Sequence, residues 1–337
     1  MAFSPLLSLL KNHDPRAFLQ ISGDWKSLLR MHFLHAALES GLLPALLEPR
    51  TREELVEGMG VECPELLDGI LELGMSLGEL ALKDGRYRVK GSRSRALQQE
   101  RNDALAAMVE ANVTYYNDVF RGFSRRMRGA PLDRGMESIG PLVARVSKIA
   151  EPYLEHFLRK LVKGKGPLRV LDVGCGSGLH LKTALEENRE LHGVGLEMDP
   201  GVVLQARDNL EGWGIDDRLK IVQGDVRAIP EDAVGPFDLL FLFSVVYYFQ
   251  VPERISILRD LRERLSPHGR LAVAVSCRGE GADRFSANLN LATTSMEGLT
   301  PLPTPQEMEA QLREAGFQTV ARERLIPGTT YFGFVAS

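Results

Sequence analysis

A glycine-rich loop follows a short apolar run at residues 172–178, Asp-Val-Gly-Cys-Gly-Ser-Gly, and a helix is expected to begin near Leu179. Gly174, Gly176 and Gly178 allow the backbone to turn tightly, and they let a ligand approach because they carry no Cβ. A lone glycine loop is a weak signal of ligand binding. Whether this loop indicates a ligand site therefore depends on which residues follow the neighbouring apolar runs.

Two carboxylates end the next two apolar runs. Glu197 comes about 20 residues after the loop, where a carboxylate can accept both hydroxyls of a ribose. Asp225, in Gly224-Asp-Val226, is suited to an adenine amino group, although a turn-forming role is the alternative. The loop reads G-x-G-x-G, without the later third glycine that seats a helix against a pyrophosphate. This spacing favours an adenosine-containing sulfonium over a dinucleotide.

The elements that must position these residues alternate between strands and helices. Short apolar runs at 169–173, 192–197, 219–223, 237–243 and 270–277 are separated by helical segments such as 200–211. This alternation predicts a parallel, doubly wound α/β sheet.

The N-terminal hundred residues have a different pattern. Helical periodicity predicts an amphipathic helix over 24–40 that includes Trp25 and Leu28. Thr51 to Glu54 form a capping box, and Pro64 opens a second short helix. The apolar face expected for that second helix consists of Leu66, Leu67, Ile70, Leu71 and Leu77. Two β-like runs around Asp84-Gly85 then predict a hairpin. Helix, turn, helix and hairpin are the order of a winged helix.

The hairpin and the segment after it are locally basic, which is compatible with DNA binding. The basic residues are Lys83, Arg86, Arg88, Lys90, Arg93 and Arg95. The second helix, however, carries Glu65, Asp68 and Glu72 and no lysine or arginine to meet phosphates. These acidic residues favour a dimerisation module.

A helical middle segment separates the two patterns. We expect a helix over 104–123, a stretch interrupted by Gly and Pro at 128–141, and a helix that ends at Leu161. Residues 163–167 resemble a linker. The expected domains are a winged-helix-like dimerisation domain at 1–100, a helical linker and substrate-roof segment at 101–162, and a catalytic domain at 163–337.

Composition limits the classes of function. A chain of 337 residues with 44% hydrophobic residues is expected to form about two domains. A formal charge of −4 argues against general affinity for nucleic acid or an anionic membrane. Three distant cysteines, Cys63, Cys175 and Cys277, indicate neither a disulfide framework nor a zinc site. No apolar run is long enough to span a membrane. We expect a soluble, cytoplasmic protein with small-molecule partners and no bound metal.

The loop at 172–178, then Glu197, then Gly224-Asp225, in this order on successive strand ends, resembles the class I S-adenosylmethionine-dependent methyltransferases. With the winged helix ahead of them, nearly the whole chain is similar to the dimeric small-molecule O-methyltransferases of secondary metabolism. The resemblance implies a Rossmann-like sheet whose last strand is antiparallel, and an intertwined homodimer. It also implies S-adenosyl-L-methionine as cofactor, with its methionine part at the glycine loop, its ribose at Glu197 and its adenine at Asp225 and the backbone of Val226. The expected cofactor residues are Asp172, Gly174, Gly176, Gly178, Glu197, Met198, Asp225, Val226, Phe243 and Ser244.

The segment after the fourth strand departs from that family. Its members typically carry His, Asp and Trp there, and the His takes a proton from the acceptor, whereas this chain has Tyr247, Tyr248 and Phe249. A histidine with a pKa of about 6.5 deprotonates a hydroxyl at neutral pH, but a tyrosine with a pKa of about 10 is mostly a donor. Tyr247 is the candidate catalytic residue. Three interpretations stay open: the tyrosines orient the acceptor, form aromatic walls for a cationic or amine acceptor, or are structural. His180, near the loop, is more simply a polar residue of the helix's first turns.

The substrate candidates are Tyr115, Tyr116, Tyr248, Arg284, Asn288 and Met296. Helical spacing offers core packing as the alternative for Tyr116. The function expected is methylation of a small acceptor, first at oxygen. Methylation at carbon or nitrogen is the alternative, and a winged-helix regulator with a cofactor-sensing domain is a third.

Overall fold

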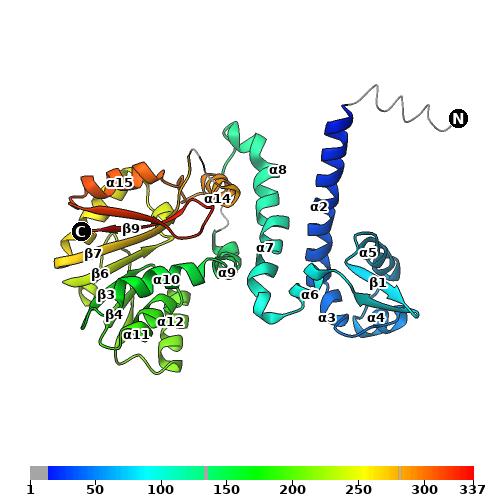
Figure 1. Ribbon diagram of the computed structural model, residues 1–337, viewed down its shortest axis with the longest axis horizontal. Helices are drawn as coiled ribbons and strands as arrows, with labels where there is room; N and C mark the ends of the chain where they lie inside the picture. The colour runs from blue at the N-terminus through cyan, green and yellow to red at the C-terminus, as the bar shows by residue number, and fades with distance from the viewer. Residues whose placement is uncertain (1–13, 133–135, 280, 282) are drawn as a thin grey trace. The chain divides into compact units, whose positions relative to one another are not determined.

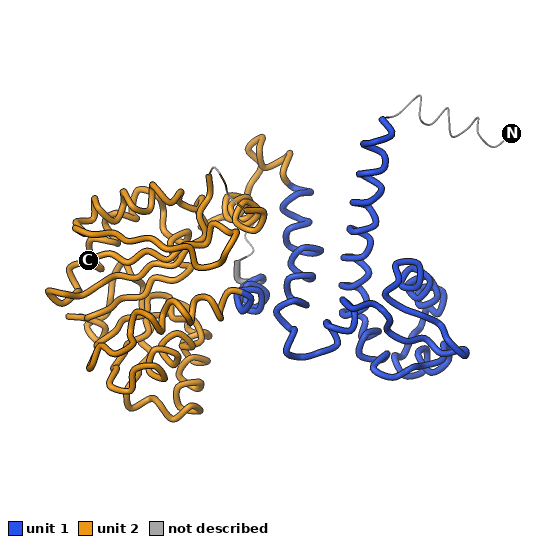
Figure 2. The backbone as a smooth tube through the Cα atoms, in the orientation of Figure 1, with its two compact units in different colours: residues 1–122, 137–149 blue, residues 123–136, 150–337 orange. Residues whose placement is uncertain are grey.

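The computed structural model describes residues 14–132, 136–279, 281 and 283–337. The chain divides into two compact units (Figure 2): unit 1 comprises residues 1–122 and 137–149, and unit 2 comprises residues 123–136 and 150–337. The three domains expected from the sequence stay a prediction. Each unit is described by itself below.

Unit 1 is mainly helical and holds one small hairpin (Figure 1). Its elements are α2 (Pro15–Glu39), α3 (Leu42–Ala45), α4 (Arg52–Gly58), α5 (Pro64–Ser76), β1 (Leu80–Lys83), β2 (Arg86–Val89), α6 (Ser92–Leu97), the 3₁₀ turn η1 (Glu100–Asn102), α7 (Asp103–Val113), most of α8 (Tyr115–Met127) and most of α9 (Met136–Ser147). Phe33, Leu34 and Leu71 are among the residues of its core.

Local sequence signals explain the start of several of these elements. The Thr51 hydroxyl accepts the Glu54 N–H at 3.2 Å while the Glu54 carboxylate accepts the Thr51 N–H at 2.9 Å, so the predicted capping box is confirmed. Asp84 and Gly85 both have positive φ, as the tight turn between β1 and β2 requires. Helix α2 begins earlier than expected because the Asp14 carboxylate accepts the N–H groups of its first turn.

Three expectations for this part of the chain were wrong. Leu66 is 74% exposed, so the buried face of α5 is narrower than its apolar pattern suggests. The helix expected over 104–123 breaks at Thr114, whose hydroxyl donates to the Glu110 carbonyl and whose ψ of −84° is not helical. Pro141 lies inside α9 instead of interrupting it. A proline costs a helix one N–H donor, and α9 continues despite that loss.

Unit 2 contains a seven-stranded sheet in the order β5-β4-β3-β6-β7-β9-β8 (Figure 1). Its strands are β3 (Arg169–Val173), β4 (His192–Glu197), β5 (Leu219–Gln223), β6 (Phe237–Phe243), β7 (Leu265–Ser276), β8 (Val320–Arg324) and β9 (Tyr331–Ala336). Strands β3 to β7 pair in parallel, and β9 is antiparallel to β7 and β8. The predicted doubly wound α/β sheet with an antiparallel last strand is confirmed.

Helices cover both faces of this sheet. The helices of unit 2 are α10 (Glu151–Val162), α11 (Leu179–Glu187), α12 (Pro200–Gly212), α13 (Arg254–Glu263), α14 (Arg284–Thr294) and α15 (Pro305–Glu314), with 3₁₀ turns η2 (Glu231–Ala233), η3 (Val246–Tyr248) and η4 (Val251–Glu253). Helices α13 and α15 pack on one face through Leu258 and Leu312. Helices α10, α11 and α12 pack on the other through Leu158, Leu181 and Val203. The strand ends are therefore held by two buried layers.

Candidate functional site

The glycine loop connects the carboxyl end of β3 to α11. Gly174, Gly176 and Gly178 all have positive φ, at 70°, 52° and 82°. A Cβ on Gly174 would lie 2.8 Å from the Val245 side chain, and one on Gly178 would lie 2.9 Å from Leu210. A Cβ on Gly176 would meet no atom within 4 Å. The outer two glycines thus allow close packing, while Gly176 leaves open space where a ligand can approach the backbone.

Glu197, at the end of β4, is bonded to this loop. Its Oε2 accepts the Gly176 N–H at 3.1 Å, and its Oε1 accepts the N–H groups of Met198 at 2.8 Å and Asp199 at 3.1 Å. An ionised carboxylate has about four acceptor positions, and three are occupied by these N–H groups, so about one remains for a ligand hydroxyl. The Met198 side chain is 63% exposed beside it. The geometry brings the loop and the carboxylate together as the sequence predicted.

Asp172 is a buried carboxylate directly before the loop. It is 1% exposed, and its Oδ2 has no hydrogen-bond donor among the residues that the structure describes. The Nδ1 atom of His180 lies 3.7 Å from that oxygen, and the His180 ring meets Phe243 edge-on with centroids 5.3 Å apart. A buried carboxylate without full pairing is costly, so this oxygen is available to a cationic ligand group.

Asp225 follows β5 and is half-buried. It accepts the Arg227 N–H at 2.9 Å, and both of its oxygens lie 3.2 Å from Nη1 of the Arg227 guanidinium. Val226 is buried and belongs to the core layer of α13 and α15, so its backbone is the part available to a ligand. No pattern in the sequence singles out Arg227, because the partners of a long side chain depend on how the loops pack.

The end of β6 lies beside the glycine loop. The Phe243 side chain is buried and stacks on Phe241, with ring centroids 5.3 Å apart. Ser244 has a φ of 58°, which is uncommon for a residue other than glycine and indicates a constrained turn. The Ser244 side chain hydrogen-bonds the Tyr331 hydroxyl, and burial raises the pKa of Tyr331 to about 12. Sequence reasoning missed Tyr331, which reads as an ordinary aromatic residue of a strand.

The two tyrosines after β6 form the 3₁₀ turn η3, and their ring centroids lie 5.0 Å apart. The Tyr247 carbonyl accepts both the N–H of Thr300 at 2.9 Å and its hydroxyl at 3.0 Å. Burial, and then the negative charge of Glu197, raise the pKa of Tyr248 above its ordinary value. Tyr248 is therefore a hydrogen-bond donor at neutral pH and not a base.

A buried arginine holds this turn in place. Arg254 is 2% exposed and donates to the Thr300 hydroxyl at 2.6 Å, to the Pro301 carbonyl at 2.7 Å and to the Phe249 carbonyl at 3.3 Å. Burial lowers the pKa of its guanidinium. Arg254 reads in the sequence as a polar residue of a surface helix, so no signal identified it.

The candidate substrate residues lie in both units. In unit 2, Arg284 is exposed at the start of α14, the Oδ1 of Asn288 is buried without a hydrogen-bond donor in the described part of the chain, and Met296 is buried. In unit 1, the rings of Tyr115 and Tyr116 lie 5.1 Å apart, and burial raises the pKa of Tyr116. The roles of all five residues in substrate binding stay predictions.

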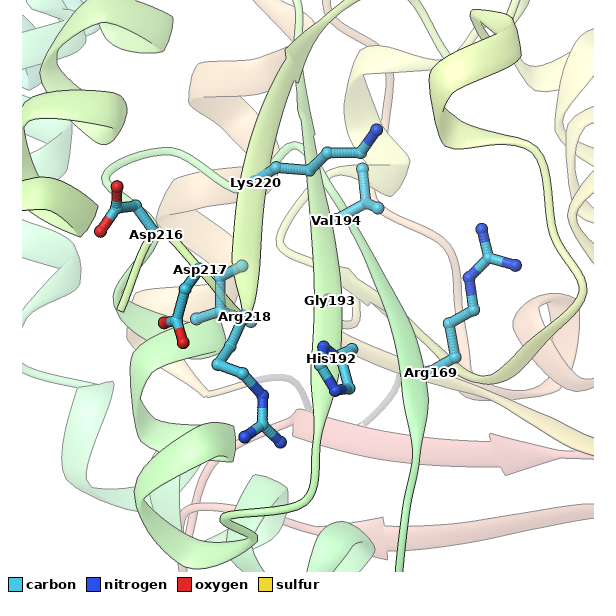
Figure 3. A pocket seen from close by; sticks show the side chains of 9 residues that line it. Arg169, His192, Gly193, Val194, Asp216, Asp217, Arg218 and Lys220 are labelled. Atoms are coloured by element: carbon cyan, nitrogen blue, oxygen red, sulfur yellow. The ribbon is translucent and has the colours of Figure 1, made fainter. Parts of the chain in front are cut away.

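A shallow hollow lies at the amino ends of β3, β4 and β5, away from the glycine loop (Figure 3). It is lined by Arg169, His192, Gly193, Val194, Asp216, Asp217, Arg218, Leu219 and Lys220. Both acidic and basic side chains line it, and the Arg218 guanidinium already donates to the Arg189 carbonyl at 2.8 Å. None of the expected site residues lines this hollow.

Within residues 14–132, 136–279, 281 and 283–337, no three or more His, Cys, Asp or Glu side chains cluster where they could hold a metal ion. No helix in this part of the chain is both long and apolar enough to cross a bilayer.

Residues 170–269 match a family model described as "Methyltransferase domain". Trans-aconitate 2-methyltransferase of Methylobacterium nodulans is 30% identical over 161 residues, which cover 44% of this chain and 57% of that protein. Sterol 24-C-methyltransferase ERG6B of Gibberella zeae is 27% identical over 175 residues, which cover 52% of this chain and 43% of that protein. The chain thus spans about half the length of the curated relatives it matches.

Solved structures match over a longer range. The structure of the mitomycin 7-O-methyltransferase MmcR has a TM-score of 0.79 and 19% sequence identity, and the match covers 98% of this chain and 99% of that one. The shared fold therefore includes the N-terminal helical region as well as the sheet.

Proposed function

We propose, on the premise that this chain contains a methyltransferase domain, that it transfers a methyl group from S-adenosyl-L-methionine to a small-molecule acceptor, with oxygen as the preferred acceptor atom. One observation carries the proposal. The glycine loop, Glu197 and Asp225 stand at the ends of the neighbouring parallel strands β3, β4 and β5, at the edge of an α/β sheet where ligands bind.

The residues at this edge fit the parts of the cofactor. Asp172, whose buried Oδ2 accepts no hydrogen bond from the described residues, suits the ammonium group of the methionine part, and the open space at Gly176 admits that part to the loop backbone. Glu197 would accept a ribose hydroxyl at its remaining acceptor position. Asp225 and the backbone of Val226 would meet the adenine. Bound S-adenosyl-L-methionine supplies an electrophilic methyl group, and the protein contributes orientation and a dry site.

The acceptor side lacks a histidine at position 247, and the raised pKa of Tyr248 makes that residue a donor. We infer that Tyr247 orients the acceptor by hydrogen bonding and that the rate enhancement comes from positioning. Methylation at carbon or nitrogen is the second candidate, because an enolisable carbon or a neutral amine demands less of a base. The curated relatives include an enzyme named for a carbon position, which is consistent with this alternative.

We also propose an oligomeric state and a cellular location for the protein. The order α4, α5, β1 and β2 is that of a winged helix, and α2 exposes the large apolar side chains of Phe18, Leu19, Ile21, Trp25 and Leu28. Apolar residues gathered on one exposed helix mark an interaction surface. We infer a homodimer of a cytoplasmic enzyme of secondary metabolism, with α2 in the interface.

Mass spectrometry tests the proposed reaction. The purified chain is incubated with S-adenosyl-L-methionine and a panel of phenols, carboxylic acids, enolisable ketones and amines. We expect at least one acceptor to gain the mass of one methylene group, and fragmentation then assigns the methylated atom. Glu197→Ala should reduce the gain strongly when the cofactor concentration is limiting. Absence of turnover across the panel, together with no binding of S-adenosylhomocysteine, would contradict the proposal.

A further inference from the structure

The guanidinium of Arg227 joins the loop after β5 to the segment after β6, although β4 and β3 lie between these two strands in the sheet. On the β5 side its Nη1 lies 3.2 Å from both oxygens of Asp225. On the β6 side its Nη2 donates to Glu253 at 2.6 Å and to the Tyr248 carbonyl at 3.3 Å, and its Nε donates to Glu253 at 3.3 Å. It also lies over the Phe249 ring, 5.7 Å from the centroid. One side chain thus contacts the proposed adenine partner and the turn that carries both tyrosines.

The turn at η3 is held from its other side as well. Thr300 donates to the carbonyls of Tyr247 and Phe249, and Arg254 donates to that of Phe249. Thr300 and Arg254 therefore fix the turn from this side. Arg227 holds it from the other side, and Arg227 also contacts Asp225. A shift of the Asp225 carboxylate on ligand binding would move the guanidinium, and the guanidinium contacts the backbone of Tyr248 directly.

We propose that Arg227 is a positioning residue that couples the cofactor subsite at Asp225 to the acceptor floor at Tyr247 and Tyr248. This inference rests on the proposed function, because it gives Asp225 a ligand. Through Arg227, a bound cofactor would order the turn at η3, where the acceptor binds.

The chemistry of the side chain explains why arginine suits this place. Its planar fork has separate donors for Asp225, Glu253 and the Tyr248 carbonyl, whereas a lysine offers one compact charge. The guanidinium also stands between two carboxylates that would otherwise repel each other. Hydrogen bonding with Glu253 raises the pKa of Arg227 and lowers that of Glu253, so both stay charged at neutral pH. Half-exposed ion pairs add little stability, so the effect expected is on geometry and coupling.

Hydrogen–deuterium exchange with S-adenosylhomocysteine as the probe tests the coupling in the full-length protein. The reporters are the amides of Tyr248 and Phe249, which donate to the Val245 and Val246 carbonyls at 2.9 and 3.2 Å. Amides of the loop at 174–178 report direct binding in the same samples. The variants are Arg227→Met, Arg227→Lys and Glu253→Gln. Arg322→Met is the matched control, because Arg322 pairs with Glu309 at 3.2 Å and lies over the Phe332 ring but contacts neither loop.

In the wild-type protein the ligand should slow exchange both at 174–178 and at 246–250. In Arg227→Met the protection at 246–250 should fall about fivefold while that at 174–178 persists at saturating ligand. Arg227→Lys should not restore it, and Glu253→Gln should reduce it in part. Arg322→Met should behave as wild type.

Unchanged protection at 246–250 in Arg227→Met would overturn the inference and leave the proposed function intact. A wild-type protein with no ligand-dependent protection at 174–178 would overturn the proposed function, and the inference with it. If Arg227→Met does not fold, Arg227→Lys and Glu253→Gln decide by the same comparison, since full protection at 246–250 in both contradicts the coupling.

Discussion

Tyr247 lies in the turn η3 after β6, its carbonyl is held by Thr300, and the proposed function puts its side chain beside the acceptor. We expect Tyr247→Phe to lower kcat by roughly tenfold, because it removes one orienting hydrogen bond worth about 0.5–1.5 kcal/mol. Steady-state kinetics with the acceptor found in the panel measure this. Tyr153→Phe serves as the matched control, because Tyr153 is an exposed tyrosine on α10 and none of the expected site residues. A loss of a hundredfold or more would make the Tyr247 hydroxyl part of the chemistry and contradict catalysis by positioning.

The pKa of Tyr248 yields a prediction about pH. Because burial and the charge of Glu197 raise it, the hydroxyl stays protonated throughout the range below its ordinary pKa of about 10. The rate should therefore show no ionisation of Tyr248 between about pH 8 and about pH 10. A pH profile of kcat checks this. An ionisation in that range that disappears in Tyr248→Phe would show that the raised pKa is wrong.

The Oδ2 atom of Asp172 accepts no hydrogen bond from the residues that the structure describes, and the proposed function assigns it a cationic ligand group. Asp172→Asn keeps the shape of the side chain and removes its charge. It should weaken binding of S-adenosylhomocysteine by about 1.5–3 kcal/mol, the range for a hydrogen bond to a charged group. Titration calorimetry measures the change. His180→Gln is the comparison variant, and unchanged affinity in Asp172→Asn would remove Asp172 from the site.

At the scale of elements, Arg254 ties the start of α13 to the turn at η3 and to the segment at 300–301. Arg254→Met should lower the free energy of unfolding by about 2 kcal/mol, because buried carbonyl and hydroxyl acceptors lose a charged donor. Urea denaturation followed by circular dichroism measures this. Arg259→Met, an exposed change on the same helix, should have little effect. Equal stability of Arg254→Met and wild type would show that the turn does not depend on Arg254.

The elements divide into those the sequence predicts and those it does not. The strands at 169–173, 192–197, 219–223 and 237–243 have the expected bounds, because buried parallel strands are short apolar runs between polar turns. The break at Thr114 was not predicted, since the periodicity continues across it and the break depends on a single backbone angle. Arg254 was missed because its burial depends on tertiary packing.

The candidate site divides in the same way. The glycine loop, Glu197 and Asp225 could be predicted because their chemistry is carried by residue type and by position after a strand. The contacts of Arg227 could not, because its partner Glu253 lies 26 residues away in another loop. Tyr331 could not be predicted as a site residue, because its contact with Ser244 depends on the pairing of β9 with β7.

At the scale of the whole molecule, the exposed apolar residues of α2 favour a homodimer. Sedimentation equilibrium should report twice the chain mass for the wild type. Trp25→Glu combined with Leu28→Glu should give a monomer, because burying two charges in an apolar interface is costly. Leu66→Glu is the control, since Leu66 is an exposed leucine on α5, at 74% against 55% for Leu28. A wild-type monomer at micromolar concentration would contradict the dimer.

The central claim is that the strand-end edge formed by the glycine loop, Glu197 and Asp225 binds S-adenosyl-L-methionine. Titration calorimetry with S-adenosylhomocysteine tests it most directly. We predict one ligand bound per chain, with Asp225→Ala and Glu197→Ala each weakening binding by about 1.5–3 kcal/mol. Asp216→Ala, an exposed carboxylate beside the hollow at the opposite strand ends, should leave affinity unchanged. Absence of binding to the wild type, or equal affinity in all three variants, would contradict the claim.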